Sequence, residues 1–313
     1  CAASYAIRHE LSVSLHDYCF AIGGDADVKI SCKAMENLLK NPHIGFYDHV
    51  LRLPVMPWRP HGDGKKLLIG SLVHEFLQIF EAGNKFTRKT SPEIFYENIK
   101  SRARRVRESV ARACAAADAA VPPGFDISVA TAATTAKLLV GALFATGDWK
   151  SFCSEYSIPR NLTVKIGDCR VKLSGRLDFL TSFGEAMDYG KVGNVPAHFP
   201  SDAVIIDFKT GGDSELTEKN VVWHLQKYDG VQLFLYGIAL EAIGFERVKI
   251  MVLKPNSRPS NEAISMDYIS ARSAELVDNL ARVIRSRLLE RRVLGNFRQY
   301  FPDLLPLATT DLY

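Results

Sequence analysis

An apolar segment that begins at Ala203 ends in a carboxylate and an amine. The segment reads AVIIDFKTG, and because side chains alternate along a strand, Asp207 and Lys209 lie on one face while Phe208 turns to the other. An acid and an ammonium side by side at a strand end could serve a hydrolytic site. Exposed pairs of this kind are common and weak, however, so the motif taken alone is explained more simply as a solvated ion pair.

A second acid lies in the preceding segment, which reads LSGRLDF from Leu173 to Phe179. Arg176 and Asp178 share one face of a predicted strand. If this strand is the antiparallel neighbour of the next one, Asp178 and Asp207 lie close together and repel each other unless a divalent cation lies between them. Oxygen ligands favour Mg²⁺ or Mn²⁺ over softer metals, so the pair predicts a metal site. For Asp178 alone, a solvated strand acid is the simpler interpretation.

A histidine lies on the flank of a predicted amphipathic helix. The apolar residues of Leu68–Phe80 recur at helical spacing, and His74 lies beside their stripe, one turn after Gly70. The glycine leaves room next to the histidine, which suits a metal ligand that faces a bulky substrate. A histidine in this position can equally be a packed or surface group.

A glutamine and a tyrosine share one face of the predicted helix Val231–Ile243. Gln232 and Tyr236 are one helical turn apart, so their side chains project together and could contact the same ligand. A competing interpretation is that Asp229–Gln232 forms a capping box, in which Gln232 only satisfies the start of the helix.

The segments that must position these residues alternate between helix and strand. In chain order we expect a helix after Ser31, the helix Leu68–Phe80, helices over about 91–145, a hairpin of Leu162–Ile166 and Arg170–Leu180, the strand Ala203–Phe208, the helix Val231–Ile243, the strand Arg247–Leu253 and the helix Ala271–Val293. This order predicts an α/β fold in which a mixed sheet is flanked by helices. The helical stretch from about 91 to 150 reads as an insertion into that fold.

Composition excludes several classes of protein. The chain has 313 residues, of which 47% are hydrophobic and 24% charged, so disordered, fibrous and coiled-coil classes fit poorly. A net charge of +4 permits a polyanionic partner without requiring one. The six cysteines form no CxxC pair, which argues against a zinc knuckle and favours reduced thiols in a cytoplasmic protein. The apolar runs are shorter than the ~20 residues of a membrane span, so no membrane contact is expected.

The order of the motifs resembles that of the RecB-like branch of the PD-(D/E)XK nuclease superfamily. GxxxH on a helix, GRLD on a strand, IIDFKTG on the next strand and QxxxY on the following helix cover residues from about 30 to 254. The segment Ile30–Leu53 is similar to the start of the nuclease domain of AddB-type helicase–nuclease subunits. The resemblance divides the chain into residues 1–25, a remnant of a preceding segment, and residues 26–313, the nuclease domain.

The resemblance implies a restriction-endonuclease-like fold and a role for each residue of the motifs. Mg²⁺ or Mn²⁺ would be held by three side chains and one backbone carbonyl: His74, Asp178, Asp207 and the carbonyl of Phe208. Lys209 would orient or activate the attacking water. Gln232 and Tyr236 would steady the lysine and the DNA strand. The expected activity is that of a Mg²⁺- or Mn²⁺-dependent deoxyribonuclease, an exonuclease on a single strand supplied by a helicase partner subunit in DNA repair and recombination.

Two features depart from the family pattern. Many relatives carry an iron–sulfur cluster with one cysteine before the proline of the opening segment and three near the carboxyl end. Here Asn41 occupies the first position and no cysteine follows Cys169, so no iron–sulfur cluster is expected. The loop Ser182–Ser201 is longer than such relatives need, and Asp188 and Asp202 read as solvated loop acids rather than ligands.

Basic residues gather in the first half of the helical stretch. Five of them lie between positions 100 and 107 without an intervening acid: Lys100, Arg102, Arg104, Arg105 and Arg107. Phosphate contact is the favoured interpretation, because a salt-dependent charge contact of this kind dominates binding to nucleic acid. The expected DNA-binding residues are Arg102, Arg104, Arg105 and Arg176.

Two alternatives stay open. In the first, the domain is a non-catalytic scaffold that grips DNA or a partner subunit within a helicase–nuclease assembly. A scaffold has no chemical need for Lys209 beside two acids, which favours catalysis. In the second, the chain is a stand-alone RecB-like exonuclease, and the opening segment Ile30–Leu53 argues against that.

Overall fold

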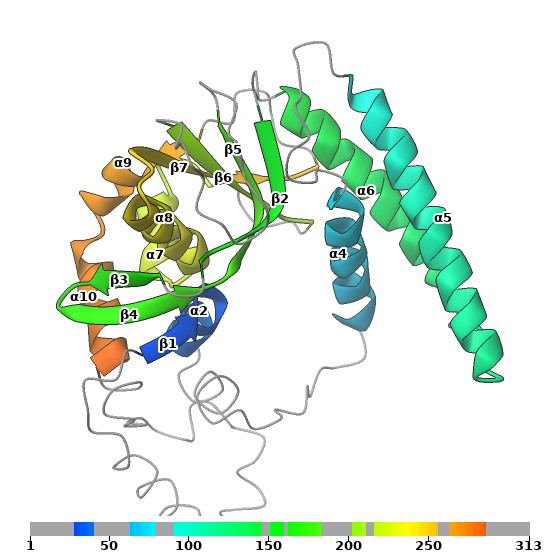
Figure 1. The fold of residues 1–313 in the computed structure, drawn as a ribbon, viewed down its shortest axis with the longest axis horizontal. Helices are drawn as coiled ribbons and strands as arrows, with labels where there is room; N and C mark the ends of the chain where they lie inside the picture. Colours follow the sequence, from blue (N-terminus) through cyan, green and yellow to red (C-terminus); the bar gives the residue numbers. More distant parts are fainter. Residues whose placement is uncertain are drawn as a thin grey trace, which may run out of the picture.

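The computed structural model describes eight stretches of the chain, which are residues 28–40, 63–78, 91–145, 151–159, 162–182, 202–210, 216–255 and 263–285 (Figure 1). The predicted remnant 1–25, most of the opening segment after Lys40 and the loop that follows Ser182, with Asp188, lie outside the described residues.

A five-stranded mixed sheet carries the DFK segment at its centre. Its strands, in spatial order, are β2 (Ser151–Ser157), β5 (Arg176–Ser182), β6 (Asp202–Phe208), β7 (Arg247–Leu253) and β8 (Ile264–Ser265). β6 and β7 are parallel, and the other neighbours are antiparallel. A strand with partners on both sides and helices over both faces must be apolar throughout, as the AVII run of β6 is.

A smaller three-stranded sheet adjoins the first. It contains β1 (Val28–Ser31), β4 (Cys169–Ser174) and β3 (Thr163–Ile166), in that spatial order. β3 and β4 form the predicted hairpin around Gly167 and Asp168, and Gly167 has a φ of 58°, a left-handed conformation that glycine adopts readily. The long predicted strand Arg170–Leu180 is interrupted at Gly175, where the chain leaves the small sheet and enters the large one.

Helices cover both faces of the large sheet (Figure 1). One side carries α2 (Cys32–Lys40), α7 (Val221–Gln226), α8 (Val231–Ile243), α9 (Met266–Ser270) and α10 (Ala274–Val283). The other side carries α4 (Asp63–Leu77) and α6 (Phe125–Ala145), with α5 (Pro92–Ala116) outermost. Neighbouring residues of β6 serve both cores, since Ile205 packs on the α8 side and Ile206 on the α4 side. The predicted mixed sheet flanked by helices is confirmed.

The helical stretch forms an antiparallel pair that belongs to the core. Phe95 of α5 and Phe144 of α6 pack with ring centroids 5.4 Å apart. Among the described residues, α6 is the one helix long and apolar enough to cross a membrane, but its inner residues, such as Leu139 and Leu143, are fully buried against α4 and the sheet. α6 therefore completes the second core of the fold.

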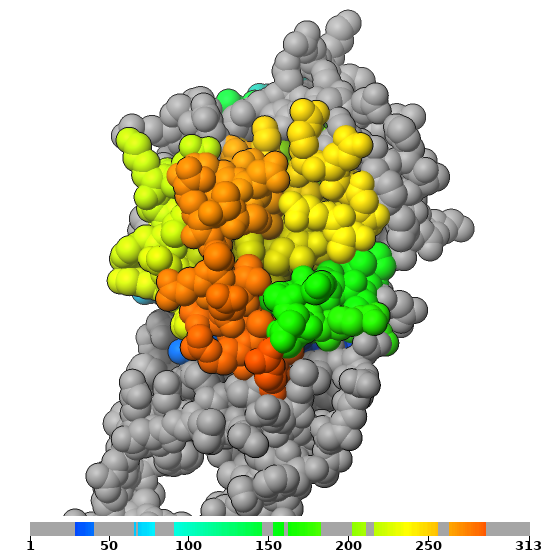
Figure 2. Space-filling model, turned by 90° about the vertical axis from the view of Figure 1, so that its left-hand side faces the viewer, coloured from blue at the N-terminus to red at the C-terminus, as the bar shows by residue number. Residues whose placement is uncertain are grey.

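Several elements differ from those expected. The strand β2 and the short elements α7, β8 and α9 were not predicted, and α4 begins at Asp63 rather than Leu68. β2 reads SFCSEYS, a segment with few strand-favouring residues, and its conformation depends on pairing with β5. The last helix, α10, begins at Ala274 rather than at the predicted Ala271. The short helix α9 comes first, and the hydroxyl of Ser265 caps it by accepting the Tyr268 N–H at 3.2 Å. Figure 2 shows α9 and α10 beside the β3–β4 hairpin on one face of the molecule.

Gly175 allows an aromatic ring to pass against the backbone between β4 and β5. A Cβ atom added at this position would lie 2.6 Å from Cε1 of Tyr236 and 3.2 Å from its hydroxyl oxygen. The Gly175 carbonyl also accepts the Ile158 N–H at 2.9 Å, which ties the passage to the segment after β2. This hydrogen bond holds the backbone of Gly175 in place, so the strand cannot easily move away to make room for a side chain beside the ring of Tyr236.

Gly175→Ala is expected to lower the free energy of unfolding by about 1–3 kcal/mol, because the added methyl group overlaps the ring of Tyr236. Urea denaturation of the wild type, Gly175→Ala, Tyr236→Leu and the double variant measures this. The double variant should lose less than the sum of the two single losses, since the overlap is then gone. Strictly additive losses would show that the glycine is not required by the ring.

Candidate active site

Two aspartates face each other where β5 and β6 run side by side. The register pairs Phe179 with Ile206, which places Asp178 opposite Asp207 on the same face. The two carboxyl groups are close enough to share a hydrogen bond, and Asp178 Oδ2 also accepts the Phe208 N–H at 3.3 Å. Burial and the charge of Asp207 raise the pKa of Asp178. The structure thus brings together the two acids that lie 29 positions apart in the sequence.

His74 reaches the same place from α4. Its Nδ1 lies 3.6 Å from Asp178 Oδ1, and about a third of the side chain is exposed. Burial lowers the pKa of His74, although the charges of Asp207 and Glu155 oppose the shift. The imidazole is therefore neutral at neutral pH and offers a lone pair, as a metal ligand must. At Gly70, an added Cβ would lie 3.8 Å from Thr210 Oγ1, an ordinary contact, and the use of the room beside this glycine by a substrate stays a prediction.

Lys209 extends along the carboxylate pair. Its Nζ lies 2.8 Å from Asp207 Oδ2, and its side chain is half exposed. Burial works against the charge of Lys209, but Asp207 and Asp178 outweigh it and raise the pKa of the lysine. Besides this ion pair, the buried Asp207 Oδ2 forms no hydrogen bond within the described residues. A carboxylate oxygen can accept more than one partner, so this atom retains the capacity for a second one.

The donors at this edge fit a hard divalent cation. No three His, Cys, Asp or Glu side chains in the described stretches are already arranged as a metal site. The remaining acceptor capacity of Asp207 Oδ2, the raised pKa of Asp178 and the neutral imidazole of His74 are nevertheless features that a bound cation would satisfy. Oxygen donors with one imidazole suit Mg²⁺ or Mn²⁺. The side chain of Phe208 lies in the core 5.5 Å from the Phe179 ring, and the role of its carbonyl stays a prediction.

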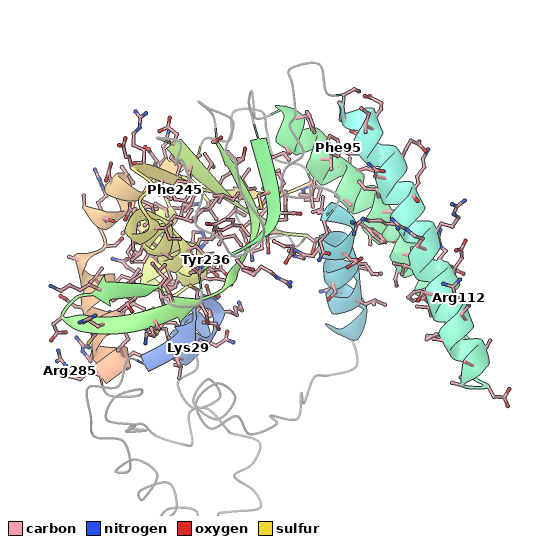
Figure 3. The ribbon with its side chains drawn as sticks, in the orientation of Figure 1. Lys29, Phe95, Arg112, Tyr236, Phe245 and Arg285 are labelled. Carbon is pink, nitrogen blue, oxygen red and sulfur yellow. The ribbon has the colours of Figure 1, made fainter. Side chains whose placement is uncertain are left out.

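Gln232 and Tyr236 connect α8 to the strand that carries Asp178. Gln232 Nε2 donates to the Tyr236 hydroxyl at 2.7 Å, and that hydroxyl donates to the Arg176 carbonyl at 3.0 Å. Figure 3 shows Tyr236 between the helix and the strands. Within the described residues these bonds engage the two side chains with each other and with β5, so a direct contact with Lys209 stays a prediction.

The capping-box interpretation of Gln232 is wrong. Gly230, with a φ of 78°, is the N-cap that precedes α8, and no side-chain hydrogen bond caps the helix from this position. The Gln232 N–H instead donates to Glu36 Oε2 of α2 at 2.9 Å. Glu36 is 4% exposed, and Lys33 and Lys40 both lie 3.1 Å from its Oε1. Burial alone would raise the pKa of Glu36, but the Gln232 N–H and the two lysines outweigh burial and lower it.

The structure adds an acid that the sequence did not indicate, Glu155 of β2. The pairs Ser154–Phe179 and Tyr156–Leu177 place it across from Asp178. Its φ is 56°, a left-handed conformation that costs a residue with a side chain about 1–3 kcal/mol. Its carboxylate forms an ion pair with the guanidinium of Arg176. Since β2 itself was not predicted, no pattern in the sequence could have placed Glu155 at this site.

The arginines of α5 have partners that were not expected. Arg102 donates to the carbonyl oxygens of Glu75 and Gln78, both at 3.1 Å, and so binds the last turn of α4. Its guanidinium is already engaged there, which makes it a support for the helix that carries His74. Acids outside the 100–107 span pair with other members of the cluster, since ion pairs link Lys100 to Glu97, Arg104 to Glu108 and Arg107 to Asp126. Arg105 is exposed.

Asp202 lies far from the carboxylate pair. It is the first residue of β6, six positions before the end of the strand, and its Oδ1 lies 2.6 Å from Arg247 Nε. The expected loop position of Asp202 is therefore corrected to a strand position. As an acid on the same strand, it offers a matched control for Asp207.

Comparison with known families gives one result. The family model described as the PD-(D/E)XK nuclease superfamily matches residues 29–302. The matched range contains every side chain placed at the site above. A search of curated proteins gives no match.

Affinity for Mg²⁺ is expected to increase with pH. The raised pKa of Asp178 means that the acid pair retains a proton that a cation must displace, so binding is weak in acid and strengthens about tenfold per pH unit until that pKa is passed. Calorimetric titration over a series of pH values, in buffers of different ionisation enthalpy, measures the affinity and the protons released. Asp202→Asn should keep this pH dependence. Affinity that is independent of pH, with no proton released, would contradict the assignment.

Glu36→Gln is expected to lower the free energy of unfolding at neutral pH by about 1–3 kcal/mol, because it removes a buried charge that accepts three donors. The pKa of Glu36 is lowered in the fold, so its contribution is present above the ordinary carboxyl pKa and is lost as the pH falls through the lower one. Denaturation at neutral and acidic pH should therefore show the difference shrinking in acid. Glu97→Gln, at an exposed pair, should change little, and equal losses in both variants would refute the role of Glu36.

Proposed function

Because this chain belongs to the PD-(D/E)XK nuclease superfamily, we propose that it is a Mg²⁺- or Mn²⁺-dependent deoxyribonuclease whose site is the edge of β5 and β6. The observation that carries the proposal is the convergence of two carboxylates, a neutral imidazole and an ammonium from three separate segments. Hydrolysis of a phosphodiester needs positive charge beside the phosphorus and a positioned water. At this edge, a cation held by the carboxylates and the ammonium of Lys209 would provide the positive charge and position the water.

Each residue of the site has a task in this proposal. His74, Asp178 and Asp207 would hold the cation, together with the Phe208 carbonyl. When bound, such a cation lowers the pKa of its water and offsets the charge that develops on the phosphate. Lys209 keeps its proton because Asp207 and Asp178 raise its pKa, so its task is to orient the water and stabilise the phosphate oxygens as a cation rather than to act as a base.

Contacts to the nucleic acid would come from the exposed arginines. Arg176 is 64% exposed and precedes Asp178 by two residues on the same face of β5, so it lies beside the reacting phosphate. Arg104 and Arg105 are exposed on α5 and provide a second, salt-dependent contact. Arg102 contributes indirectly by supporting α4.

The finer assignment rests on the resemblance of the motifs. The order GxxxH, GRLD, IIDFKTG and QxxxY, and the segment Ile30–Leu53, support a RecB-like enzyme of the AddB type. Such an enzyme would act as an exonuclease on a single strand of DNA, with a helicase partner, in the repair of double-strand breaks. No three acidic, histidine or cysteine side chains of the described residues form a ready metal site, and this observation favours the alternative of a non-catalytic scaffold that binds DNA.

An assay on end-labelled single- and double-stranded DNA with Mg²⁺, Mn²⁺ or EDTA tests the proposal. The wild type should cut only with the metal ions. Asp207→Asn and Lys209→Ala should each reduce the rate at least about a hundredfold, because each removes a group that stabilises the transition state. Thermal unfolding verifies that both variants fold.

Two surface variants serve as matched controls. Asp202→Asn changes an acid at the other end of β6, and Lys165→Ala changes an exposed lysine of β3, so both should cut at the wild-type rate. Cutting that persists in Asp207→Asn and Lys209→Ala would remove the assignment of the site. A wild type that binds DNA without cutting it would favour the scaffold.

A further inference from the structure

We infer that Glu155 is a positioning residue, whose carboxylate holds the guanidinium of Arg176 beside the aspartate pair so that it can grip a phosphate of the nucleic acid strand. The inference deepens the proposed function and rests on it. It concerns how the strand is bound, and it is separate from the chemistry of Asp207 and Lys209.

The contacts fix Arg176 at both ends. Its backbone carbonyl accepts the Tyr236 hydroxyl at 3.0 Å, and its Nε forms the ion pair with Glu155 Oε2. The side chain remains 64% exposed, whereas the Glu155 side chain is only 21% exposed. Because its backbone and its Nε are both held while the rest of the guanidinium is exposed, the arginine is oriented before any ligand binds.

The ion pair leaves the edge of the guanidinium that carries the two terminal amino groups open for a phosphate. Arginine has five N–H donors in a planar fork, and Glu155 uses the one on Nε. Within the described residues, no acidic side chain pairs with the terminal amino groups at the other edge. Those two groups match the spacing of phosphate oxygens, and fixing the side chain in advance reduces the entropy lost on binding.

The backbone of Glu155 is held in an unfavourable conformation at this one position. Its φ of 56° lies in a run where Ser154 and Tyr156 keep their regular pairs with β5, so the departure is confined to a single residue. Glycine or asparagine would adopt this conformation more readily than glutamate. A residue that is poorly suited to its own backbone conformation is expected where its side chain has a task.

The charges place the pair beside the metal-binding side chains. Glu155 raises and Arg176 lowers the pKa of His74, so both lie within electrostatic range of the imidazole. A third acid near Asp178 and Asp207 would by itself repel a phosphate strand. Pairing with Arg176 offsets that charge, and the guanidinium is the more exposed member of the pair.

Binding of a fluorescein-labelled single-stranded oligonucleotide, measured in EDTA over a range of salt, tests the inference on the full chain. Glu155→Gln should weaken binding about fivefold to tenfold, and Arg176→Gln should weaken it similarly and reduce the salt slope by about one. The double variant should bind no more weakly than Arg176→Gln alone, because the two residues act as one unit. Asp168→Asn, which breaks an exposed ion pair with Arg285, should bind like the wild type.

A second set of variants separates positioning from folding. Glu155→Gly and Glu155→Asn relieve the backbone, so both should unfold at a higher temperature than the wild type and still lose the same affinity. The inference would be overturned if Glu155→Gln bound the oligonucleotide as tightly as the wild type. It would also be overturned if the affinity losses of the two single variants multiplied in the double variant. So would a loss of Mg²⁺ affinity in Glu155→Gln by calorimetry, because Glu155 would then be a metal ligand.

The binding assay does not depend on cutting. If the wild type cuts no DNA but Glu155→Gln weakens binding as expected, the proposed chemistry fails and the inference stands. If the wild type cuts and Glu155→Gln binds normally, the inference alone fails.

Discussion

Two carboxylates that cannot move apart determine the chemistry of this site. The antiparallel register of β5 and β6 holds Asp178 and Asp207 opposite each other, and both are mostly buried. Without a cation the repulsion is relieved by a retained proton and by the ammonium of Lys209, as the raised pKa values of Asp178 and Lys209 show. The fold therefore holds two acids in an unfavourable arrangement that a divalent cation would relieve.

The surrounding elements keep that strand edge in place. α8 is bound to β5 through Tyr236 and to α2 through Glu36, and α5 supports α4 through Arg102. Each of these is a hydrogen bond between different elements of the fold. The positions of Asp178 and His74 thus depend on contacts made by residues outside the carboxylate pair.

Local patterns predicted the elements better than the contacts between them. Alternation identified β5 and the β3–β4 hairpin, a continuous apolar run identified β6, and the order of the motifs identified the acids that meet. The sequence could not reveal Glu155, because SFCSEYS is a strand only through its pairing with β5 and its left-handed residue has no local signal. The contacts of Glu36 with α8 and of Arg102 with α4 were missed for a related reason, since a cap from another helix follows from packing rather than from spacing.

The passage at Gly175 links the position of Asp178 to the length of one run of chain. β4 and β5 are one run of chain shared by two sheets, with pairs to β3 on one side of the glycine and to β6 on the other. Inserting or deleting a single amino acid between Cys169 and Asp178 would turn the acid from the ligand-facing side into the hydrophobic interior. The number of residues in that run therefore decides which face of β5 presents Asp178.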